Sequence, residues 1–341
     1  MLMTQLTLQD LPPKWAHFCL EICSFVQAEL RLHLQGSSLL LAASRGVDST
    51  ALILWAHVTQ SRLQTRLQAA HLHHGLRQEA DAEAESIQNL CARLSLDLIQ
   101  GRTDVSTYAR RQNLGLEEAG RILRYRFLTR RASKMDADYL LTAHHLNDLT
   151  EDVLLRQIRG TGWPALAGMP AWHQGSKILR PFLLTPKQVL IDFVRACGQT
   201  WMEDPSNLDL SFTRNRIRHR ILPLLLEENP GFLGQTADLW RQGQMDADYW
   251  DLKIQDCVYG ERQLSQGLLL PAEELDNLHP AQRLRWYRHA LDRLGPGQAL
   301  AANLFRLDRA WQKRTWNKRF QFPGNKEIRI TSQGLLCSVS S

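Results

Sequence analysis

The chain of 341 residues is 44% hydrophobic and 22% charged, which is the composition of a globular protein and excludes a disordered or fibrous chain. Its length favours two domains or one domain with an extension, and its formal net charge of +6 favours an anionic partner such as nucleic acid. No apolar run approaches the ~20 residues of a membrane span. The amino terminus lacks a basic region followed by an apolar run, and no two of the six cysteines form a C-x-x-C pair. We therefore expect a reduced, cytoplasmic protein without a membrane segment, a zinc ribbon or a redox motif.

The first 160 residues alternate between helical and strand-like patterns. Helical spacing of apolar residues predicts helices at 15–34, 48–60, 79–94, 117–132 and 148–159. Short apolar runs predict strands at 38–43, 66–72, 96–100 and 139–143. This alternation is typical of βαβ units. We therefore predict an α/β fold with a doubly wound, mostly parallel sheet and a ligand site at the carboxyl ends of its strands.

The pattern changes after about residue 226. Two of the helical segments that follow are predicted at 283–294 and 304–313, and the last stretch has short β-like runs broken by Pro323-Gly324-Asn325 and Gln333-Gly334. We predict an amino-terminal helix at 1–36, an α/β domain at 37–225, and a smaller, mainly helical domain at 226–341 with a short β end.

The stretch LLLAASRGVDSTALILWAH, from Leu39 to His57, joins an apolar strand to a helix through a short turn. The free N–H groups and the positive end of a helix that begins near Asp48 together form an anion site. Asp48 and Ser49 are also common caps, so a plain capped helix is the alternative interpretation. A Walker loop is excluded because the sequence has no G-x-x-x-x-G-K-[ST] here.

The hexamer of this turn resembles the PP-loop, S-G-G-x-D-S, of the ATP pyrophosphatases at five of six positions. It reads Ser44-Arg45-Gly46-Val47-Asp48-Ser49. The resemblance implies a sheet of the adenine-nucleotide alpha-hydrolase type, and an enzyme that releases pyrophosphate from ATP and leaves AMP on the activated substrate. Arg45 is the departure, because a Cβ penalises positive φ and keeps the backbone further from a phosphate. If the position has negative φ, arginine is tolerated and its guanidinium is able to hold phosphate.

Further segments carry a closer resemblance. They are HLHHGLR at 71–77, the basic helix LEEAGRILRY at 116–125, TAHHLNDLTEDVLLRQIRGTG at 142–162, EDPSN at 203–207 and TRNRIRH at 213–219. In the basic helix the matching positions are Glu117, Arg121, Arg124 and Tyr125. In this order and spacing, residues 38–222 resemble the tRNA(Ile)-lysidine synthetases, a subgroup of the PP-loop enzymes.

The resemblance implies an ATP-dependent ligation of L-lysine to C2 of the wobble cytidine in an isoleucine tRNA with anticodon CAU. ATP first adenylates the C2 oxygen and releases pyrophosphate. The ε-amine of lysine then displaces AMP and gives lysidine. ATP and Mg²⁺ are the expected cofactors, and tRNA(Ile) and lysine the expected partners. Residues 37–225 would bind ATP and catalyse the reaction, and residues 226–341 would bind tRNA. The sequence leaves the oligomeric state open, with a homodimer as one option.

The same resemblance implies the site residues. The nucleotide would contact the loop and two histidines that follow strands, namely Ser44, Arg45, Gly46, Val47, Asp48, Ser49, His71 and His144. Asp48 and Asp148 are the expected Mg²⁺ ligands. Asp148 and Glu151 share one helix face and are expected to orient lysine, although carboxylates so placed also suit Mg²⁺ or a helix dipole. Arg121 is expected to neutralise developing charge or tRNA phosphate, as is Arg214.

Several alternatives stay open. The family commonly has D-D-Q where this chain has Asn147-Asp148-Leu149, so Asp148 and Glu151 must supply the acidic role alone. A zinc site at His71, His73 and His74 is disfavoured because no cysteine or carboxylate partner is near in the sequence. Two basic runs fit phosphate contacts with RNA, but basic runs are also common on solvated faces. They comprise Arg121, Arg124, Arg126, Arg130 and Arg131, and Arg214, Arg216, Arg218 and Arg220.

Three other functions are alternatives to that of a lysidine synthetase. A tRNA thiolase of the PP-loop class uses catalytic cysteines, often paired, and the sequence shows no such pair. A glutamine-dependent amidotransferase needs a glutaminase domain, for which the chain has no room. The remaining alternative is a non-catalytic or altered-specificity PP-loop protein that binds tRNA, with Arg45 and Asn147 as its signs of degeneration.

Overall fold

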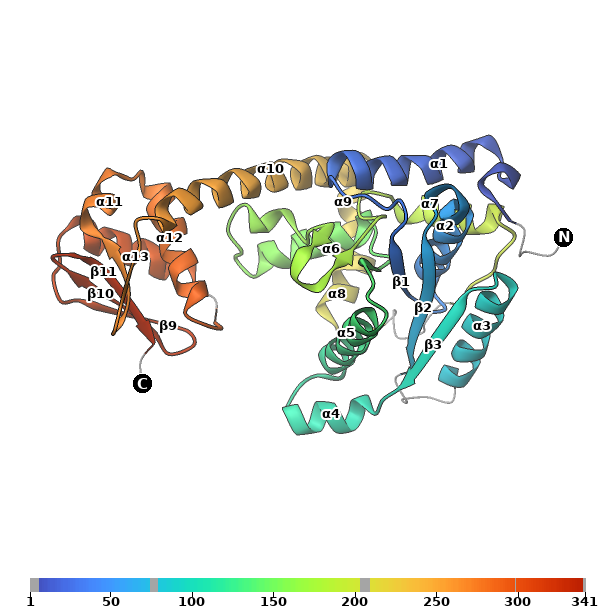
Figure 1. Cartoon of the computed structure of the whole chain (residues 1–341), viewed down its shortest axis with the longest axis horizontal. Helices are drawn as coiled ribbons and strands as arrows, with labels where there is room; N and C mark the ends of the chain where they lie inside the picture. Colours follow the sequence, from blue (N-terminus) through green and yellow to red (C-terminus); the bar gives the residue numbers. More distant parts are fainter. Residues whose placement is uncertain (1–5, 74–78, 203–208, 298, 340–341) are drawn as a thin grey trace. The chain divides into compact units, whose positions relative to one another are not determined.

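The computed structural model describes residues 6–73, 79–202, 209–297 and 299–339, and the chain forms two compact units (Figure 1). The first unit contains Met1–Thr161 and Gly168–Trp240, and the second contains Gly162–Ala167 and Arg241–Ser341. The division falls inside helix α10 (Phe232–Val258), whereas the predicted boundary lies near residue 226. The first half of α10 contributes Ala237 and Trp240 to a core cluster of the first unit, which explains the later position.

A six-stranded sheet forms the centre of the first unit, in the order β3-β2-β1-β4-β6-β5. All its pairings are parallel except that between β5 and β6, which confirms the predicted α/β, doubly wound sheet. The strands are β1 (Ser38–Ala42), β2 (Arg66–His73), β3 (Asp97–Arg102), β4 (Tyr139–Leu141), β5 (Trp172–His173) and β6 (Ile178–Leu179). Successive strands from β1 to β4 run parallel because a helix returns the chain between them.

Helices cover both faces of this sheet. Alternate residues of β1 divide between two cores: Leu39 and Leu41 face a core built with α1, α2, α3 and α7, and Leu40 faces the core under α5. The bounds are α1 (Pro13–Ser24), α2 (Val47–Leu63), α3 (Glu79–Arg93), α5 (Leu116–Lys134) and α7 (Lys187–Ala196). The first core is the larger, and α2 is buried along most of its length.

The amino-terminal helix belongs to the larger core. Phe18 of α1 packs against Phe182 and Phe193, with ring centroids 6.4 and 5.2 Å apart. The helix predicted over 15–34 is shorter in the structure, because α1 passes into a π-helical turn over Phe25–Glu29 and Arg31 then adopts a left-handed φ of 55°. The described part of this segment, residues 6–36, therefore packs into the core of the α/β unit.

Several short elements of the first unit were not predicted. Among them, α4 (Val105–Gln112) begins where Asp104 accepts a hydrogen bond from the Thr107 N–H. This unit also contains the helices α6 (Leu146–Ile158), α8 (Thr213–Arg216) and α9 (Leu222–Glu228). Among the described residues, no helix is long and apolar enough to cross a membrane.

The second unit combines helices with a five-stranded antiparallel sheet, in the order β7-β8-β11-β10-β9. Its elements are β7 (Arg262–Leu264), β8 (Gly267–Pro271), α11 (Ala272–Asn277), α12 (Pro280–Arg293), α13 (Ala301–Gln312), β9 (Arg319–Phe322), β10 (Lys326–Thr331) and β11 (Gly334–Val339). The core includes Trp286, Tyr287 and Trp311. Lys326 is fully buried, and its Nζ donates to the carbonyls of Leu291, Gly295 and Gly297 at 3.1, 3.0 and 2.6 Å. The helical segments and the β end predicted for this part of the chain are confirmed.

Candidate functional site

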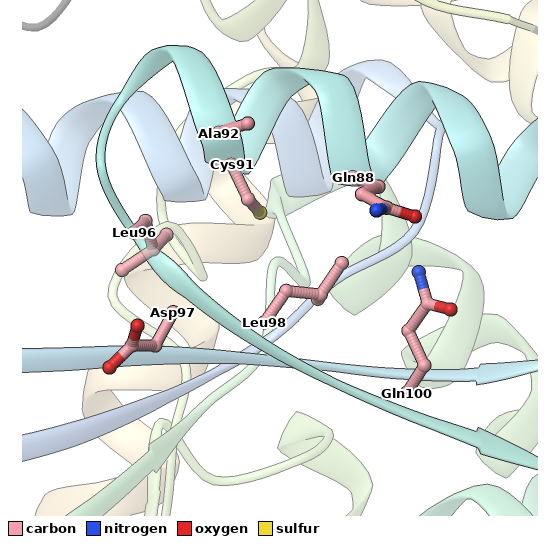
Figure 2. A pocket seen from close by; sticks show the side chains of 7 residues that line it. All are labelled: Gln88, Cys91, Ala92, Leu96, Asp97, Leu98 and Gln100. Atoms are coloured by element: carbon pink, nitrogen blue, oxygen red, sulfur yellow. The ribbon is translucent and has the colours of Figure 1, made fainter.

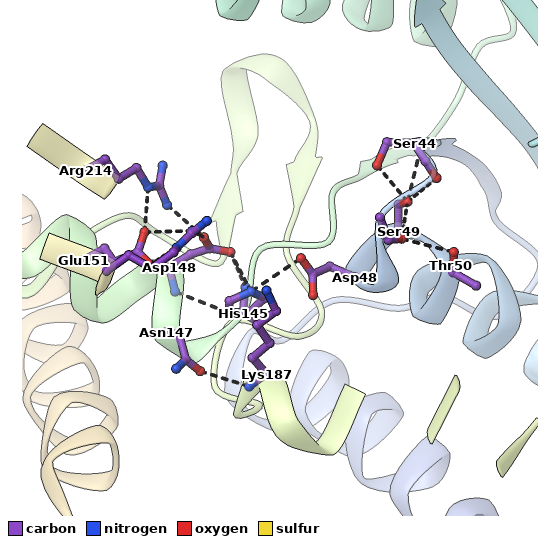
Figure 3. Close-up of polar contacts among 12 residues, drawn as sticks. Ser44, Asp48, Ser49, Thr50, His145, Asn147, Asp148, Glu151, Lys187 and Arg214 are labelled. Carbon is purple, nitrogen blue, oxygen red and sulfur yellow. Dashed lines mark hydrogen bonds and ion pairs between the residues drawn. The ribbon is translucent and has the colours of Figure 1, made fainter. Parts of the chain in front are cut away.

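The turn after β1 is shaped by a serine of the helix that follows. Ser49 Oγ lies 2.5 Å from the carbonyl oxygen of Ser44 and 3.1 Å from that of Gly46, and it accepts the Ser44 N–H at 3.2 Å and the Ser44 hydroxyl at 2.9 Å (Figure 3). Thr50 also donates to the Gly46 carbonyl at 3.1 Å. The Ser49 hydroxyl is therefore fully engaged within the loop, and we assign it to holding the loop's shape. Its contact with phosphate stays a prediction.

Arg45 is compatible with the backbone of this loop. It is not among the residues with positive φ, so its Cβ causes no left-handed strain. Its carbonyl accepts the Met202 N–H at 3.3 Å, and its Nε is buried without a hydrogen-bond partner among the described residues. Gly46 has φ −67°, and a Cβ there would only make an ordinary contact with Ser44 Oγ at 3.8 Å. The loop thus keeps its form without a second glycine, and the guanidinium keeps an unused donor.

Two of the predicted histidines lie at the strands on either side of β1: His71 near the end of β2, and His144 just after β4. His71 Nδ1 lies 3.1 Å from the carbonyl oxygen of Ala43, and because a carbonyl only accepts, Nδ1 carries the proton. Burial lowers the pKa of His71. His144 Nδ1 lies 3.0 Å from Thr142 Oγ1, and burial lowers the pKa of His144 to about 3. Both imidazoles are therefore neutral near pH 7, and His71 supports the loop from the neighbouring strand.

The first two turns of α6 hold two carboxylates that are bound by two arginines. Arg214 Nε donates to Glu151 Oε2 at 2.7 Å, and its Nη2 donates to Asp148 Oδ1 at 2.9 Å (Figure 3). Arg218 Nε donates to Glu151 Oε1 at 2.6 Å, and its Nη2 lies 3.0 Å from Glu151 Oε2 and 3.2 Å from Asp148 Oδ1. Arg214 lies in α8 and Arg218 in the turn that follows it. We call these four residues the carboxylate–arginine cluster.

His145 connects this cluster to the loop. Its Nε2 lies 3.3 Å from Asp148 Oδ2 and 3.5 Å from Asp48 Oδ2, and its Nδ1 accepts the Asp148 N–H at 3.3 Å (Figure 3). Burial disfavours the charged imidazole, but Asp148 and Asp48 outweigh it and raise the pKa of His145. His145 is nearly inaccessible, with 2% of its side chain exposed. It holds Asp48, from the start of α2, beside Asp148, from the start of α6.

We predict that the Asp148 carboxylate stabilises the fold in a pH-dependent way. Burial would raise the pKa of Asp148, but His145, Arg214 and Arg218 outweigh it and lower that pKa far below its usual range. A carboxyl whose pKa is lower in the folded state stabilises the fold above its unfolded pKa of about 3.9, and this contribution is lost as the pH falls. Urea unfolding should therefore show a constant difference in free energy between wild type and Asp148→Asn above about pH 5 and a shrinking one below about pH 4. A difference that stays constant down to pH 2.5 would contradict this assignment.

Other predicted residues lie elsewhere. Arg121 is exposed on α5 and pairs with Glu118 at 2.8 Å, outside the cluster, so its role stays a prediction. Asn147 Oδ1 accepts the Lys187 N–H at 2.9 Å, at the start of α7. An amide oxygen meets this structural need without a negative charge, which explains how asparagine is tolerated. Val47 is buried in the larger core and anchors the loop. His74–Arg77 and 203–207 lie outside the described residues.

Three residues of the site were not assigned from the sequence. In the sequence Arg218 is only one of four alternating arginines. The turn after α8 decides which of these arginines reach α6. Arg180 follows β6 at the carboxyl edge of the sheet, where the two-residue strand gave no sequence signal. His145 was overlooked beside His144, although the cap position of a helix start was a usable signal.

The side chains fit a divalent cation at Asp48. Asp48 Oδ1 is buried and has no hydrogen-bond partner among the described residues. Within the same residues no group of three histidine, cysteine, aspartate or glutamate side chains forms a metal site. Mg²⁺ commonly takes one or two carboxylates and completes its shell with water and substrate phosphates. Asp48 and Asp148, which both contact His145, would supply these carboxylates. Substrate phosphates would have to supply further ligands.

A hollow of about 400 Å³ lies between α3 and β3 (Figure 2). It is lined by Gln88, Cys91, Ala92, Leu96, Asp97, Leu98 and Gln100. None of these belongs to the loop after β1, to the cluster or to the histidines, and β3 is the edge strand of the sheet. The loop, the cluster and the histidines therefore gather at the carboxyl ends of β1 and β4, away from this hollow.

Known proteins resemble this chain in sequence and in fold. Residues 17–225 match the PP-loop domain family. The chain is 40% identical to a tRNA(Ile)-lysidine synthase from Nitratidesulfovibrio vulgaris, over 87% of this chain and 91% of that protein. It is 35% identical to the tRNA(Ile)-lysidine synthase of Azoarcus sp. (strain BH72), over 77% of this chain and 58% of that longer protein. A U34-tRNA thiolase structure from Methanococcus maripaludis superposes with a TM-score of 0.56 at 13% identity, over 68% of this chain and 79% of that one, and so shares the fold. The chain therefore belongs to the PP-loop family and, within it, to the tRNA(Ile)-lysidine synthases, which are ATP-using ligases.

Proposed function

We propose that this protein ligates L-lysine to C2 of the wobble cytidine in tRNA(Ile) with anticodon CAU, through an adenylated tRNA, and gives lysidine, AMP and pyrophosphate. The observation that carries the proposal is the contact of His145 with both Asp48 and Asp148. Through this contact the loop after β1, which resembles a PP-loop, lies next to the partly buried carboxylate–arginine cluster. An oxygen on a pyrimidine ring is a poor leaving group, and adenylation makes it a good one. The protein's work is therefore mainly positioning and charge neutralisation.

The loop after β1 would hold the phosphates of ATP. The N–H groups at the start of α2 and the dipole of this 17-residue helix favour an anion there. The free Nε of Arg45 adds a donor that a glycine would not supply. Asp48, assisted by Asp148, would hold Mg²⁺, which neutralises phosphate charge when it is bound.

The two carboxylates of α6 would share the work of placing lysine unequally. Asp148 has 13% of its side chain exposed, whereas Glu151 has 1%. Asp148 is thus the carboxylate that an ammonium group is able to approach, and Glu151 fixes the positions of Arg214 and Arg218. This division refines the prediction that both carboxylates touch lysine.

The basic helix α5 would contact tRNA phosphates. Arg124, Arg126 and Arg130 are exposed along it and form no ion pair with a described residue. Such contacts position RNA without reading its sequence. The cytoplasmic location and the homodimer also stay predictions.

The direct test is an incubation of the purified protein with ATP, Mg²⁺, labelled lysine and a CAU tRNA(Ile) transcript. We expect label to be retained on this RNA with release of AMP, and no label on a matched transcript with uridine at the wobble position. Tight tRNA binding without label or AMP would contradict the proposal and favour the non-catalytic tRNA-binding alternative. In that case Arg45→Gly would show whether the arginine is the cause.

A further inference from the structure

Arg180 lies at the carboxyl edge of the sheet, on the face covered by α5. Leu141 of β4 pairs with Leu179 of β6, and the Thr142 N–H donates to the Leu179 carbonyl at 3.0 Å. This parallel register sets Arg180 opposite Thr142. The preceding pair on the same face, Leu140 and Ile178, belongs to the core under α5. Because side chains alternate along a strand, Arg180 faces α5.

The guanidinium of Arg180 is held but not neutralised. Its Nη1 donates to the Pro170 carbonyl at 2.8 Å, and its Nε is buried without a hydrogen-bond partner among the described residues. No described carboxylate forms an ion pair with it. Burial lowers the pKa of Arg180, and the neighbouring Tyr125 and Asp152 only partly offset this effect. A partly buried cation without a carboxylate is costly unless an anion joins it.

Further cations converge on the same place. Arg180, Arg124 and Arg214 each act electrostatically on His144, which follows β4 and is neutral. They come from three elements: the end of β6, α5 and α8. Arg214 is bound to two carboxylates, whereas Arg124 and Arg180 have no ion pair with a described residue. The carboxyl edge between β4 and β6 therefore gathers positive charge, which Asp148 and Asp152 offset only in part.

We propose that Arg180, together with Arg124 of α5, forms a phosphate-binding subsite at this edge of the sheet. A guanidinium held by the Pro170 carbonyl, with the Tyr125 side chain beside it, still has donors in a planar fork that matches phosphate oxygens. The phosphate belongs either to the tRNA backbone or to ATP, and in this respect the inference rests on the proposed function. Arg180 would then be a binding residue that holds substrate, not one that takes part in bond making.

The test compares Arg180→Gln and Arg180→Lys with wild type. Arg66→Gln is the matched control, because Arg66 begins β2 at the opposite, amino-terminal edge of the same sheet. The affinity for a labelled CAU tRNA(Ile) transcript is measured by filter binding at several salt concentrations, and that for α,β-methylene-ATP by equilibrium dialysis. We expect Arg180→Gln to weaken one of the two ligands by at least about tenfold, with Arg180→Lys in between and Arg66→Gln unchanged. If the phosphate is that of tRNA, the slope of log affinity against log salt falls by about 0.7–0.9. If it is that of ATP, only the nucleotide affinity falls.

Both affinities within twofold of wild type would overturn the proposal. If Arg180→Gln does not fold, the ligand affinities of Arg180→Lys and Arg124→Gln test the subsite instead. Arg124 is exposed, so its substitution leaves the core intact. Unchanged binding in both of these variants would also overturn it. Binding needs no turnover, so the subsite and the proposed reaction are judged separately. If the wild-type protein makes no lysidine but the Arg180→Gln variant binds a ligand more weakly than wild type, the subsite is supported and the proposed reaction is contradicted.

Discussion

Asp148→Asn should lower the rate of lysine incorporation by about a hundredfold to a thousandfold while the protein stays folded. Asp148 contacts His145 through one oxygen and Arg214 and Arg218 through the other. The amide keeps the shape but removes the charge, so the guanidinium groups and the incoming lysine lose a common partner. Removing one preorganised electrostatic contact from a catalytic site commonly costs about a hundredfold to a thousandfold in rate, and we expect a loss of this size here.

The matched control is Asp192→Asn. Asp192 lies on α7 and pairs with Arg195 at 3.8 Å, with both side chains exposed and outside the cluster, so we expect less than about a threefold change. Labelled lysine on tRNA and pyrophosphate release are followed in parallel. Loss of both products would place Asp148 in adenylation, and loss of lysine transfer alone would place it in lysine binding. Unchanged turnover in Asp148→Asn would remove this carboxylate from the site.

Glu151→Gln should have the largest effect on stability. The Glu151 side chain is buried, and its oxygens accept hydrogen bonds from Arg214 of α8 and from Arg218 of the turn that follows α8. The substitution leaves Arg214 and Arg218 with one carboxylate between them inside the protein. We expect the free energy of unfolding to fall by about 3–5 kcal/mol. For a unit of this size, that corresponds to a decrease in Tm of roughly 6–20 °C.

Glu118→Gln is the control for this measurement. Glu118 also pairs with an arginine, Arg121, but both side chains are about half exposed. Exposed ion pairs contribute about 0–1 kcal/mol, so its unfolding midpoint should stay near that of wild type. Calorimetry and urea unfolding of the three proteins give the comparison. A cost for Glu151→Gln as small as that for Glu118→Gln would show that the buried cluster is not needed to hold α6 and α8 together.

The sheet and its helices could be predicted from the sequence because their patterns are local. Strand β1 is an unbroken apolar run, and α2 follows it after four residues. The short strands β5 and β6 have two residues each and give no periodicity to detect. Helix α4 is polar and eight residues long, so its apolar face is too small to stand out.

The site was predictable in its parts but not in its contacts. The motifs indicated Asp48, Asp148 and Glu151, yet the arginines that bind the carboxylates lie more than 60 residues further along the chain. Choosing Arg214 and Arg218 among many arginines requires the path of the chain after α8. Likewise, the choice between His144 and His145 depends on which of them faces Asp48, and that follows from where α6 begins.

The continuity of α10 has a practical consequence for dissecting this protein. The PP-loop match ends at residue 225, but Ala237 and Trp240 still pack with Leu146 and Leu149 of α6, and Trp240 Nε1 donates to the Met169 carbonyl at 2.9 Å. A truncation at residue 225 would remove the residues that pack on α6, the helix that carries Asp148 and Glu151. If such a fragment were inactive or insoluble, the result would not show that residues 226–341 are needed for tRNA binding. A fragment meant to contain the whole first unit has to extend through Trp240 and therefore ends within α10. Polar residues added after Trp240 would then cap the exposed end of this helix.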